Sequence, residues 1–208
     1  MRESDLYIKR LLKKLENIDD KELVLLIKKL IEERNYLSEI ANIDTLTGLN
    51  NRRILKRIRE CSAVVMCDID DFKQVNDNYG HDTGDMVIKA VTQVIKKNTR
   101  AKDYVCRFGG DEFFIAFVSC PESVICNRIE TIRQQLCEMK LLPDNGYNVT
   151  ISVGFVINSN FENIDELIKK ADKALYESKK NGRNMVTKYT NKNKVLRLKN
   201  KIYVNKKM

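Results

Sequence analysis

Two pairs of acidic residues stand where expected strands end, and together they are suited to binding a hard cation. Asp68 and Asp70 close an apolar strand, and period-two strand geometry puts both carboxylates on one face. Asp111 and Glu112 lie on a predicted hairpin turn, where at most one of them can face the same pocket as Asp68. Carboxylate oxygens are preferred ligands of Mg²⁺, which neutralises phosphates during nucleotidyl transfer. Taken singly, each pair would also suit an ordinary acidic surface turn.

The segment from 72 to 85 is rich in asparagine, aspartate and glycine, and we interpret it as a loop. Guanine presents N1–H and N2–H₂ donors on its Watson–Crick edge, and a carboxylate such as Asp85 can accept both, with Asn76 completing the edge. Lys73 can reach a phosphate from the same segment. An ordinary turn has the same composition, and the single histidine, His81, would without context be a structural hydrogen-bonding group.

Lys179 and Arg183 lie one turn apart where the last expected helix ends. Cations at that end of a helix suit its dipole and need no ligand. They would equally suit the negative charge of a triphosphate, and the residues alone leave both interpretations open.

The elements that must position these residues alternate between strands and helices. The expected strands are 63–70, 104–108, 113–118, 148–155 and 185–188. Helices are expected at 52–60, from a cap at Asp82 or Thr83 onward, near 122–139 and at 164–180. The continuous apolar run from 63 to 67 predicts a strand buried on both faces at the centre of the sheet. The fold class is therefore α/β (α+β), a sheet layered with helices.

Residues 1–41 have apolar residues at three-to-four spacing and read as an N-terminal helical segment, with Asp19 and Asp20 as caps. A helical pair this short cannot be a stable domain alone. It either packs on the body or pairs with the same segment of another chain.

The net charge of +9 is concentrated in residues 189–208, which hold seven Lys/Arg and no acid and leave +2 for the other 188 residues. We interpret this basic tail as a solvated extension. An acidic partner or an anionic lipid surface is the alternative.

Other features exclude several classes of protein. The six cysteines are scattered without a CxxC pair, which favours reduced thiols over disulfides or zinc binding. No apolar run approaches the roughly 20 residues of a membrane span, and the charged N-terminus lacks the core of a signal peptide. We expect a cytoplasmic chain with no transmembrane segment.

Five ordered motifs over residues 42–188 resemble the GGDEF family of diguanylate cyclases. They are DxLTxLxNRR at 44–53, DIDxFKxxND at 68–77, GHxxGD at 80–85, RFGGDEF at 107–113 and ADxALYxSKxxGRN at 171–184. Ser178 stands where alanine is usual in the last motif. A lone GGDEF string would be weak, but five spaced motifs in order are specific. The resemblance implies a palm-like central β-sheet flanked by helices, similar to nucleotide cyclases.

The resemblance also implies the activity, which is the condensation of two GTP into cyclic di-GMP and two pyrophosphates. Each subunit would bind one GTP, so a homodimer is implied, with two Mg²⁺ per GTP and Mn²⁺ as the alternative ion. By matching position, the implied metal ligands are Asp68, the Ile69 carbonyl, Asp111 and Glu112. The implied catalytic residues are Asp111 as proton acceptor, Glu112 in support and Lys73 as stabiliser of transition-state charge. The implied GTP-binding residues are Asn76 and Asp85 for guanine with His81 nearby, and Lys179 and Arg183 for the β- and γ-phosphates.

Two details refine this implied function. Arg100 and Asp103 fit the RxxD pattern that, in the family, binds the product cyclic di-GMP and inhibits turnover; as a bare pattern it also occurs by chance. Asp85 stands where relatives that make mixed cyclic GMP-AMP carry serine, which favours strict use of GTP.

Two rival hypotheses remain. One is a non-enzymatic receptor for GTP or cyclic di-GMP built on a degenerate domain, although a degenerate copy is expected to lose one of the acids that are intact here. The other is a nucleic-acid-binding protein that uses the basic tail; we expect no nucleic-acid partner.

Overall fold

The computed structural model describes residues 3–15, 20–143, 148–160, 162–190 and 196–197. The chain divides into two compact units, one ending at Ile43 and the other beginning at Asp44. No helix in the described part of the chain combines the length and the apolar character of a membrane span.

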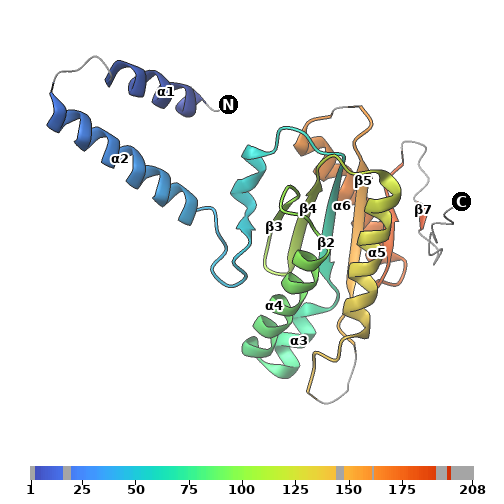
Figure 1. Cartoon of the computed structure of the whole chain (residues 1–208). Helices are drawn as coiled ribbons and strands as arrows, with labels where there is room; N and C mark the ends of the chain where they lie inside the picture. The colour runs from blue at the N-terminus through green and yellow to red at the C-terminus, as the bar shows by residue number, and fades with distance from the viewer. Residues whose placement is uncertain (1–2, 16–19, 144–147, 161, 191–195, 198–208) are drawn as a thin grey trace, which may run out of the picture. The chain divides into compact units, whose positions relative to one another are not determined.

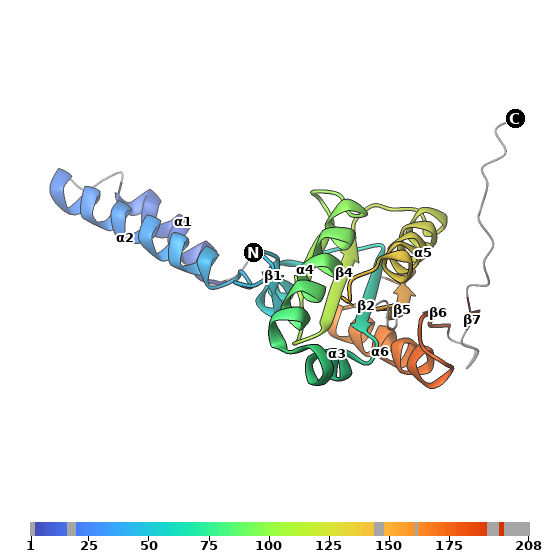
Figure 2. The ribbon, with the colours of Figure 1, turned by 90° about the horizontal axis from the view of Figure 1, so that it is seen from below.

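The first unit is a pair of helices, α1 (Glu3–Leu15) and α2 (Lys21–Ile40), which lie side by side in both views (Figures 1 and 2). The Asp20 carboxylate accepts hydrogen bonds from the N–H groups of Glu22 and Leu23, so Asp20 caps α2 as predicted. Asp19 lies outside the described residues. Leu15 is buried, whereas a row of α2 leucines stays about half exposed, namely Leu23, Leu26, Leu30 and Leu37.

The second unit is built on a seven-stranded sheet of order β1-β3-β4-β2-β5-β6-β7. The strands are β1 (Asn50–Asn51), β2 (Ala63–Ile69), β3 (Tyr104–Arg107), β4 (Glu112–Phe117), β5 (Ile151–Ile157), β6 (Val186–Lys188) and β7 (Leu196–Arg197). All seven residues of β2 are buried, and β2 pairs antiparallel with both β4 and β5. The predicted central position of this strand is therefore confirmed.

Helices cover both faces of the sheet (Figures 1 and 2). Alternate β2 residues such as Val65 and Cys67 pack on one core with α4 (His81–Lys97) and α5 (Glu122–Glu138). Val64 and Met66 point the other way and pack with α6 (Ile164–Lys180) and the 3₁₀ helix η1 (Arg52–Arg57). This layered architecture confirms the predicted fold class.

The segment 72–85 is not the loop that its composition predicted. Phe72–Tyr79 form helix α3, and α4 begins at His81 rather than after a cap at Asp82 or Thr83. Val75 is buried, and the partly buried Phe72 and Tyr79 flank it at helical spacing, so the apolar stripe outweighs the turn-forming polar residues. The corner between the helices is Gly80, whose φ of +83° suits glycine.

The predicted tail also contains structure that the sequence pattern did not indicate. Leu196–Arg197 form β7, which pairs antiparallel with β6, so these two residues are part of the sheet rather than a solvated extension. Apart from Tyr189 and Thr190, the rest of the predicted tail, residues 191–195 and 198–208, lies outside the described residues.

Candidate active site

Asp68, from the first predicted acidic pair, meets the two hairpin acids where β2 ends and β4 begins. Asp68 and Glu112 are opposite one another in the antiparallel register, so their side chains share one face of the sheet. The Ile69 N–H donates to the Asp111 carbonyl at 3.2 Å, which holds the hairpin turn against the end of β2. The sequence allowed one of the two hairpin acids to face Asp68 directly, and the register assigns that place to Glu112.

Contacts with neighbouring side chains hold the hairpin turn. A Cβ at Gly109 would lie 2.5 Å from Glu112 Oε2, so a larger residue there would require this carboxylate to move. Arg107 donates from Nε and Nη2 to the Gly110 carbonyl at 2.9 and 2.7 Å. Its Nη1 reaches Asp44 Oδ2 at 3.3 Å, which ties the turn to the start of the unit. Sequence reasoning gave Arg107 and Asp44 no role, although both lie inside quoted motifs.

Asp68 is a buried carboxylate in a place that disfavours its charge. Burial is the largest influence and raises the pKa of Asp68 to about 6, with further raising by the charges of Asp111 and Glu112. Lys179 Nζ, 2.7 Å from Asp68 Oδ2, acts in the opposite direction. An excess of negative charge that already attracts one cation is the setting in which Mg²⁺ would be favoured.

The donors present fit magnesium in number and type. Among the residues that the structure describes, no three His, Cys, Asp or Glu side chains are grouped as a ready-made metal cage. Mg²⁺ is usually held by one or two carboxylates, with phosphates and waters supplying the other ligands. Carboxylates such as those of Asp68 and Asp111, with a backbone carbonyl, are a donor set of that kind.

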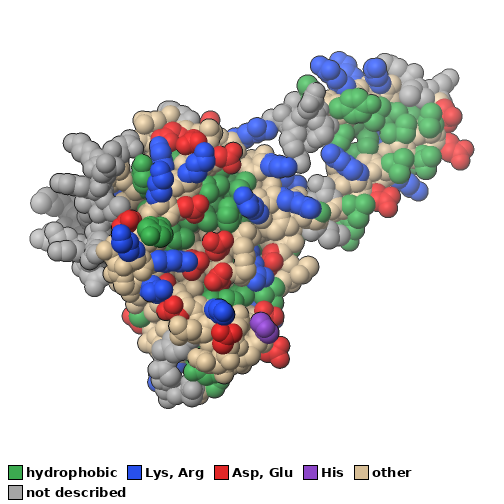
Figure 3. All heavy atoms as spheres, turned by 180° about the vertical axis from the view of Figure 1, so that it is seen from behind, with side chains coloured by type: hydrophobic (Ala, Val, Ile, Leu, Met, Phe, Trp, Pro, Cys, Tyr) green, Lys and Arg blue, Asp and Glu red, His purple; other side chains and the backbone are tan. Residues whose placement is uncertain are grey.

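The end of α6 brings Lys179 to this acidic cluster, and the turn that follows brings Arg183 to Asp71. A Cβ at Gly154 would lie 2.0 Å from the Leu175 nitrogen, so the missing side chain lets α6 sit directly on β5. Ser178 donates to the Val153 carbonyl at 2.8 Å and anchors the helix at the same place. Beyond the Lys179 contact with Asp68, Arg183 Nε lies 3.3 Å from Asp71 Oδ1. Figure 3 shows the face that α6 covers, where acidic and basic side chains lie next to one another.

The predicted guanine-binding residues lie on the corner formed by α3 and α4. A Cβ at Gly84 would lie 2.0 Å from Asn76 Oδ1, so the two helices approach closely there and Asn76 lies against the turn of α4 that carries Asp85. Asp85 and His81 are exposed on α4, and Lys73 is exposed on the first turn of α3. The structure therefore places Asn76 against the turn of α4 that precedes Asp85, while Lys73 lies on the first turn of α3, two residues after Asp71.

Arg100 and Asp103 lie at the other end of the β3–β4 pair, roughly 20 Å of strand away from the hairpin turn. Asp103 accepts hydrogen bonds from Arg100 Nε and Nη2, the N–H groups of Arg100 and Val118, and Arg128 Nη1. Burial acts to raise the pKa of Asp103, but these hydrogen bonds outweigh it and lower the pKa. The Asp103 side chain has no exposed surface, whereas a third of the Arg100 side chain is exposed.

Sequence reasoning missed two other acids of this region. Asp71 pairs with Arg183, and its φ of +53° places it in the left-handed region just before α3. On α6, burial raises the pKa of Asp172, as does the charge of Glu112. Asp172 lies in the last quoted motif, which was the available signal.

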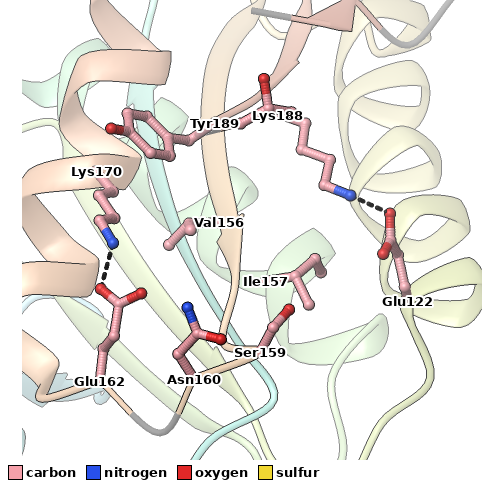
Figure 4. Close-up of a pocket in the computed structure, with 10 residues that line it drawn as sticks. Glu122, Val156, Ile157, Ser159, Asn160, Glu162, Lys170, Lys188 and Tyr189 are labelled. Carbon is pink, nitrogen blue, oxygen red and sulfur yellow. Dashed lines mark hydrogen bonds and ion pairs between the residues drawn. The ribbon is translucent and has the colours of Figure 1, made fainter. Parts of the chain in front are cut away.

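A pocket of about 200 Å³ lies elsewhere, between β6, α6 and the segment after β5 (Figure 4). Lys170 pairs with Glu162 on one side of it and Lys188 with Glu122 on the other, so its charged groups are already neutralised (Figure 4). None of the predicted site residues lines it.

Comparison with known proteins identifies the family. The sequence profile of the diguanylate cyclase GGDEF domain matches residues 41–185. Diguanylate cyclase DosC of Escherichia coli K12 is 35% identical over 178 residues, 79% of this chain and 38% of that protein. Diguanylate cyclase A of Treponema denticola is 42% identical over 131 residues, 62% of this chain and 35% of that protein.

A solved structure shows the same fold. The coiled coil and GGDEF domain of DgcB from Caulobacter crescentus, in complex with c-di-GMP, has a TM-score of 0.69 and 31% identity, covering 80% of this chain and 95% of that one. The chain spans 35% to 43% of the length of the curated relatives it matches. The family profile, these relatives and the shared fold agree, and the chain belongs to the GGDEF family of diguanylate cyclase domains.

Proposed function

We propose that the chain is a diguanylate cyclase that condenses two GTP into cyclic di-GMP in the cytoplasm. The observation that carries this proposal is the buried Asp68, whose raised pKa comes from burial and from Asp111 and Glu112, and which already attracts the cation of Lys179. A cluster of acids beside basic side chains suits a triphosphate and its metal ion, because the acids can bind the metal and the basic side chains can bind the phosphates. The named cyclases that resemble the chain support this activity.

In the proposed reaction, Asn76 and Asp85 bind the guanine edge while Lys179 and Arg183 bind the β- and γ-phosphates. Asp111 accepts the proton of the 3′-hydroxyl, the 3′-oxygen attacks the α-phosphate of the other GTP, and pyrophosphate leaves. Asp68, the Ile69 carbonyl, Asp111 and Glu112 would hold Mg²⁺, which would supply charge neutralisation at the phosphates. Lys73 stabilises the additional charge of the transition state.

Lys179 changes partner during this cycle. Without nucleotide it neutralises Asp68 at 2.7 Å. If Asp68 held a divalent cation, that cation would neutralise the carboxylate in place of Lys179, and the ammonium group would be available to the triphosphate. Lys179 would thus balance the buried charge of Asp68 in the protein alone and contact the phosphates of bound GTP.

Each copy supplies one GTP, so we propose that two copies face one another during catalysis. The α2 row of Leu23, Leu26, Leu30 and Leu37 supports pairing through the N-terminal helices, because four half-exposed leucines on one face are an unusual surface for a monomer. Activity should then depend on protein concentration.

We also propose product inhibition through Arg100. Asp103 is saturated by its own hydrogen bonds, so the contacting group for cyclic di-GMP is the exposed part of the Arg100 guanidinium. Asp103 acts here by holding that guanidinium in place.

The test is incubation of purified protein, freed of bound product, with GTP and Mg²⁺, with cyclic di-GMP measured by mass. We expect product from the wild type and none from Asp111→Ala, with both proteins folded by circular dichroism. No product from a folded, dimeric wild type would contradict the enzymatic function. Binding of GTP or cyclic di-GMP without synthesis would instead support the receptor hypothesis.

The nucleic-acid hypothesis is tested by truncation. Leu196–Arg197 belong to the sheet, so the deletion that spares the fold is 198–208. The truncated cyclase should keep its activity, whereas a nucleic-acid-binding protein should lose affinity.

A further inference from the structure

The turn between α6 and β6 holds an unfavourable backbone conformation. Gly182, Arg183 and Asn184 have φ angles of +113°, +62° and +44° in succession. Left-handed conformations are rare for residues with a side chain and persist only where surrounding contacts hold them. Arg183 is the residue of this turn that pairs with Asp71, its Nε lying 3.3 Å from Asp71 Oδ1.

A buried carboxylate that the proposed chemistry does not use holds one side of the turn. Asp70 is 5% exposed and accepts hydrogen bonds from Thr150 Oγ1 at 2.7 Å, Ser152 Oγ at 2.6 Å and the Asn184 N–H at 3.0 Å. Ser152 is the second residue of β5, and Thr150 immediately precedes this strand. Asp70 therefore ties the backbone of the turn to the sheet.

An arginine from the helix on the other face of the sheet holds the second side. Arg133 of α5 donates from Nη1 to Asn184 Oδ1 at 2.6 Å. Its Nε and Nη2 donate to Glu130 at 3.1 and 2.6 Å, and its side chain is only 12% exposed. Hydrogen bonding to Glu130 raises the pKa of Arg133, so the guanidinium stays charged. The ion pair with Glu130 holds the Arg133 guanidinium in place, and the hydrogen bond from the guanidinium holds the Asn184 side chain in place.

We propose that Arg133 is a positioning residue for substrate binding, acting through Asn184 on Arg183. This inference rests on the proposed function, in which Arg183 holds the phosphates of GTP. Without the Arg133 contact, the turn gains access to right-handed conformations that point Arg183 away from Asp71. Arg133 lies outside all five motifs, so its sequence position gives no sign of this role.

The first test compares steady-state kinetics of the wild type and Arg133→Gln. We expect KM for GTP to rise roughly tenfold and kcat to stay within about twofold, because a phosphate contact stabilises bound substrate and transition state alike. Arg133→Lys keeps a donor for Asn184 but loses the two-point contact with Glu130, so its KM should be intermediate. Gln134→Ala is the matched control, since Gln134 follows on the same helix and donates to Glu130 at 3.1 Å; its KM should match the wild type.

The second test measures nucleotide binding without turnover. It uses 3′-deoxy-GTP, which lacks the attacking hydroxyl, in the presence of Mg²⁺. Its Kd should rise roughly tenfold in Arg133→Gln, and adding Arg133→Gln to Arg183→Ala should cause no further loss if one acts through the other. If the wild type binds 3′-deoxy-GTP but makes no cyclic di-GMP from GTP, the proposed function fails. The comparison of Kd values for 3′-deoxy-GTP still decides whether Arg133 positions Arg183. An unchanged Kd, or an equal loss in the Arg183→Ala background, would overturn it.

Discussion

Two aspartates, Asp68 and Asp103, lie at opposite ends of the sheet and are buried to a similar degree, yet their surroundings act on them in opposite ways. Asp103 accepts five hydrogen bonds, and its pKa is lowered despite burial. Asp68 has one ion-pair partner, Lys179, and two acidic neighbours, and its pKa is raised to about 6. A saturated carboxylate stabilises the fold, whereas an under-partnered one is available to a ligand.

The largest effect that this comparison predicts is on catalysis. Asp68→Asn should reduce cyclic di-GMP synthesis on the order of a thousandfold or more, because loss of a metal carboxylate removes several kcal/mol of transition-state stabilisation. The measurement is the initial rate at saturating GTP and Mg²⁺. Asp165→Asn, on the exposed first turn of α6, is the control for loss of one negative charge. Retention of a tenth of the activity by Asp68→Asn would remove Asp68 from the proposed metal site.

The second effect is on stability, and it reverses between the two residues. Asp103→Asn should lower the free energy of unfolding by about 2–3 kcal/mol, because an amide brings a donor among donors and leaves Arg100 and Arg128 unpaired. Asp68→Asn should be neutral or stabilising in the metal-free protein, because it removes a buried charge. Urea unfolding in EDTA at neutral pH measures both. Equal destabilisation by the two changes would contradict the contrast.

These parts of the molecule also show how much of the structure could be predicted from the sequence. Asp68 was found because it ends a continuous apolar run, and the hairpin acids because glycines precede them; both are local patterns. Helix α3 was missed because a stretch rich in Asn and Asp resembles a turn, although Phe72, Val75 and Tyr79 carry the helical stripe. Local composition therefore misled where local periodicity would have succeeded.

Contacts between distant segments had no local signal at all. The Arg133 contact with Asn184 joins residues 51 apart, and the Asn184 contact with Asp70 joins residues 114 apart. The left-handed backbone of Arg183 is likewise a consequence of those contacts rather than of its residue type. Only tertiary packing reveals that the last motif is positioned from both faces of the sheet.

The third prediction concerns product inhibition and separates the two members of the RxxD pattern. Arg100→Ala should raise the concentration of cyclic di-GMP needed for half-inhibition at least roughly tenfold, because the exposed guanidinium that contacts product is lost. Each rate is normalised to the same variant's rate without added product. Arg53→Ala, an exposed arginine on η1, is the matched control. An inhibition curve for Arg100→Ala that superimposes on the wild type would reject this site.

The smallest predicted effect is a pH dependence of stability in the metal-free protein. Between about pH 4 and pH 6 the folded state keeps a proton on Asp68 that the unfolded state releases, since the pKa is about 6 against an ordinary 3.8. Stability from this residue should therefore fall as pH rises through that window, by about 1–2 kcal/mol once partial solvent access is allowed for. Asp103 has a lowered pKa and acts with the opposite sign, because its contribution is present above about pH 4 and is lost on acidification.

Subtracting the unfolding free energies of Asp68→Asn from those of the wild type across this range isolates the Asp68 contribution. The difference should slope downward with pH in EDTA and flatten in excess Mg²⁺, because a bound cation favours the ionised carboxylate. A flat difference curve in EDTA would mean that Lys179 alone satisfies Asp68, and the site would then resemble the saturated Asp103 rather than contrast with it.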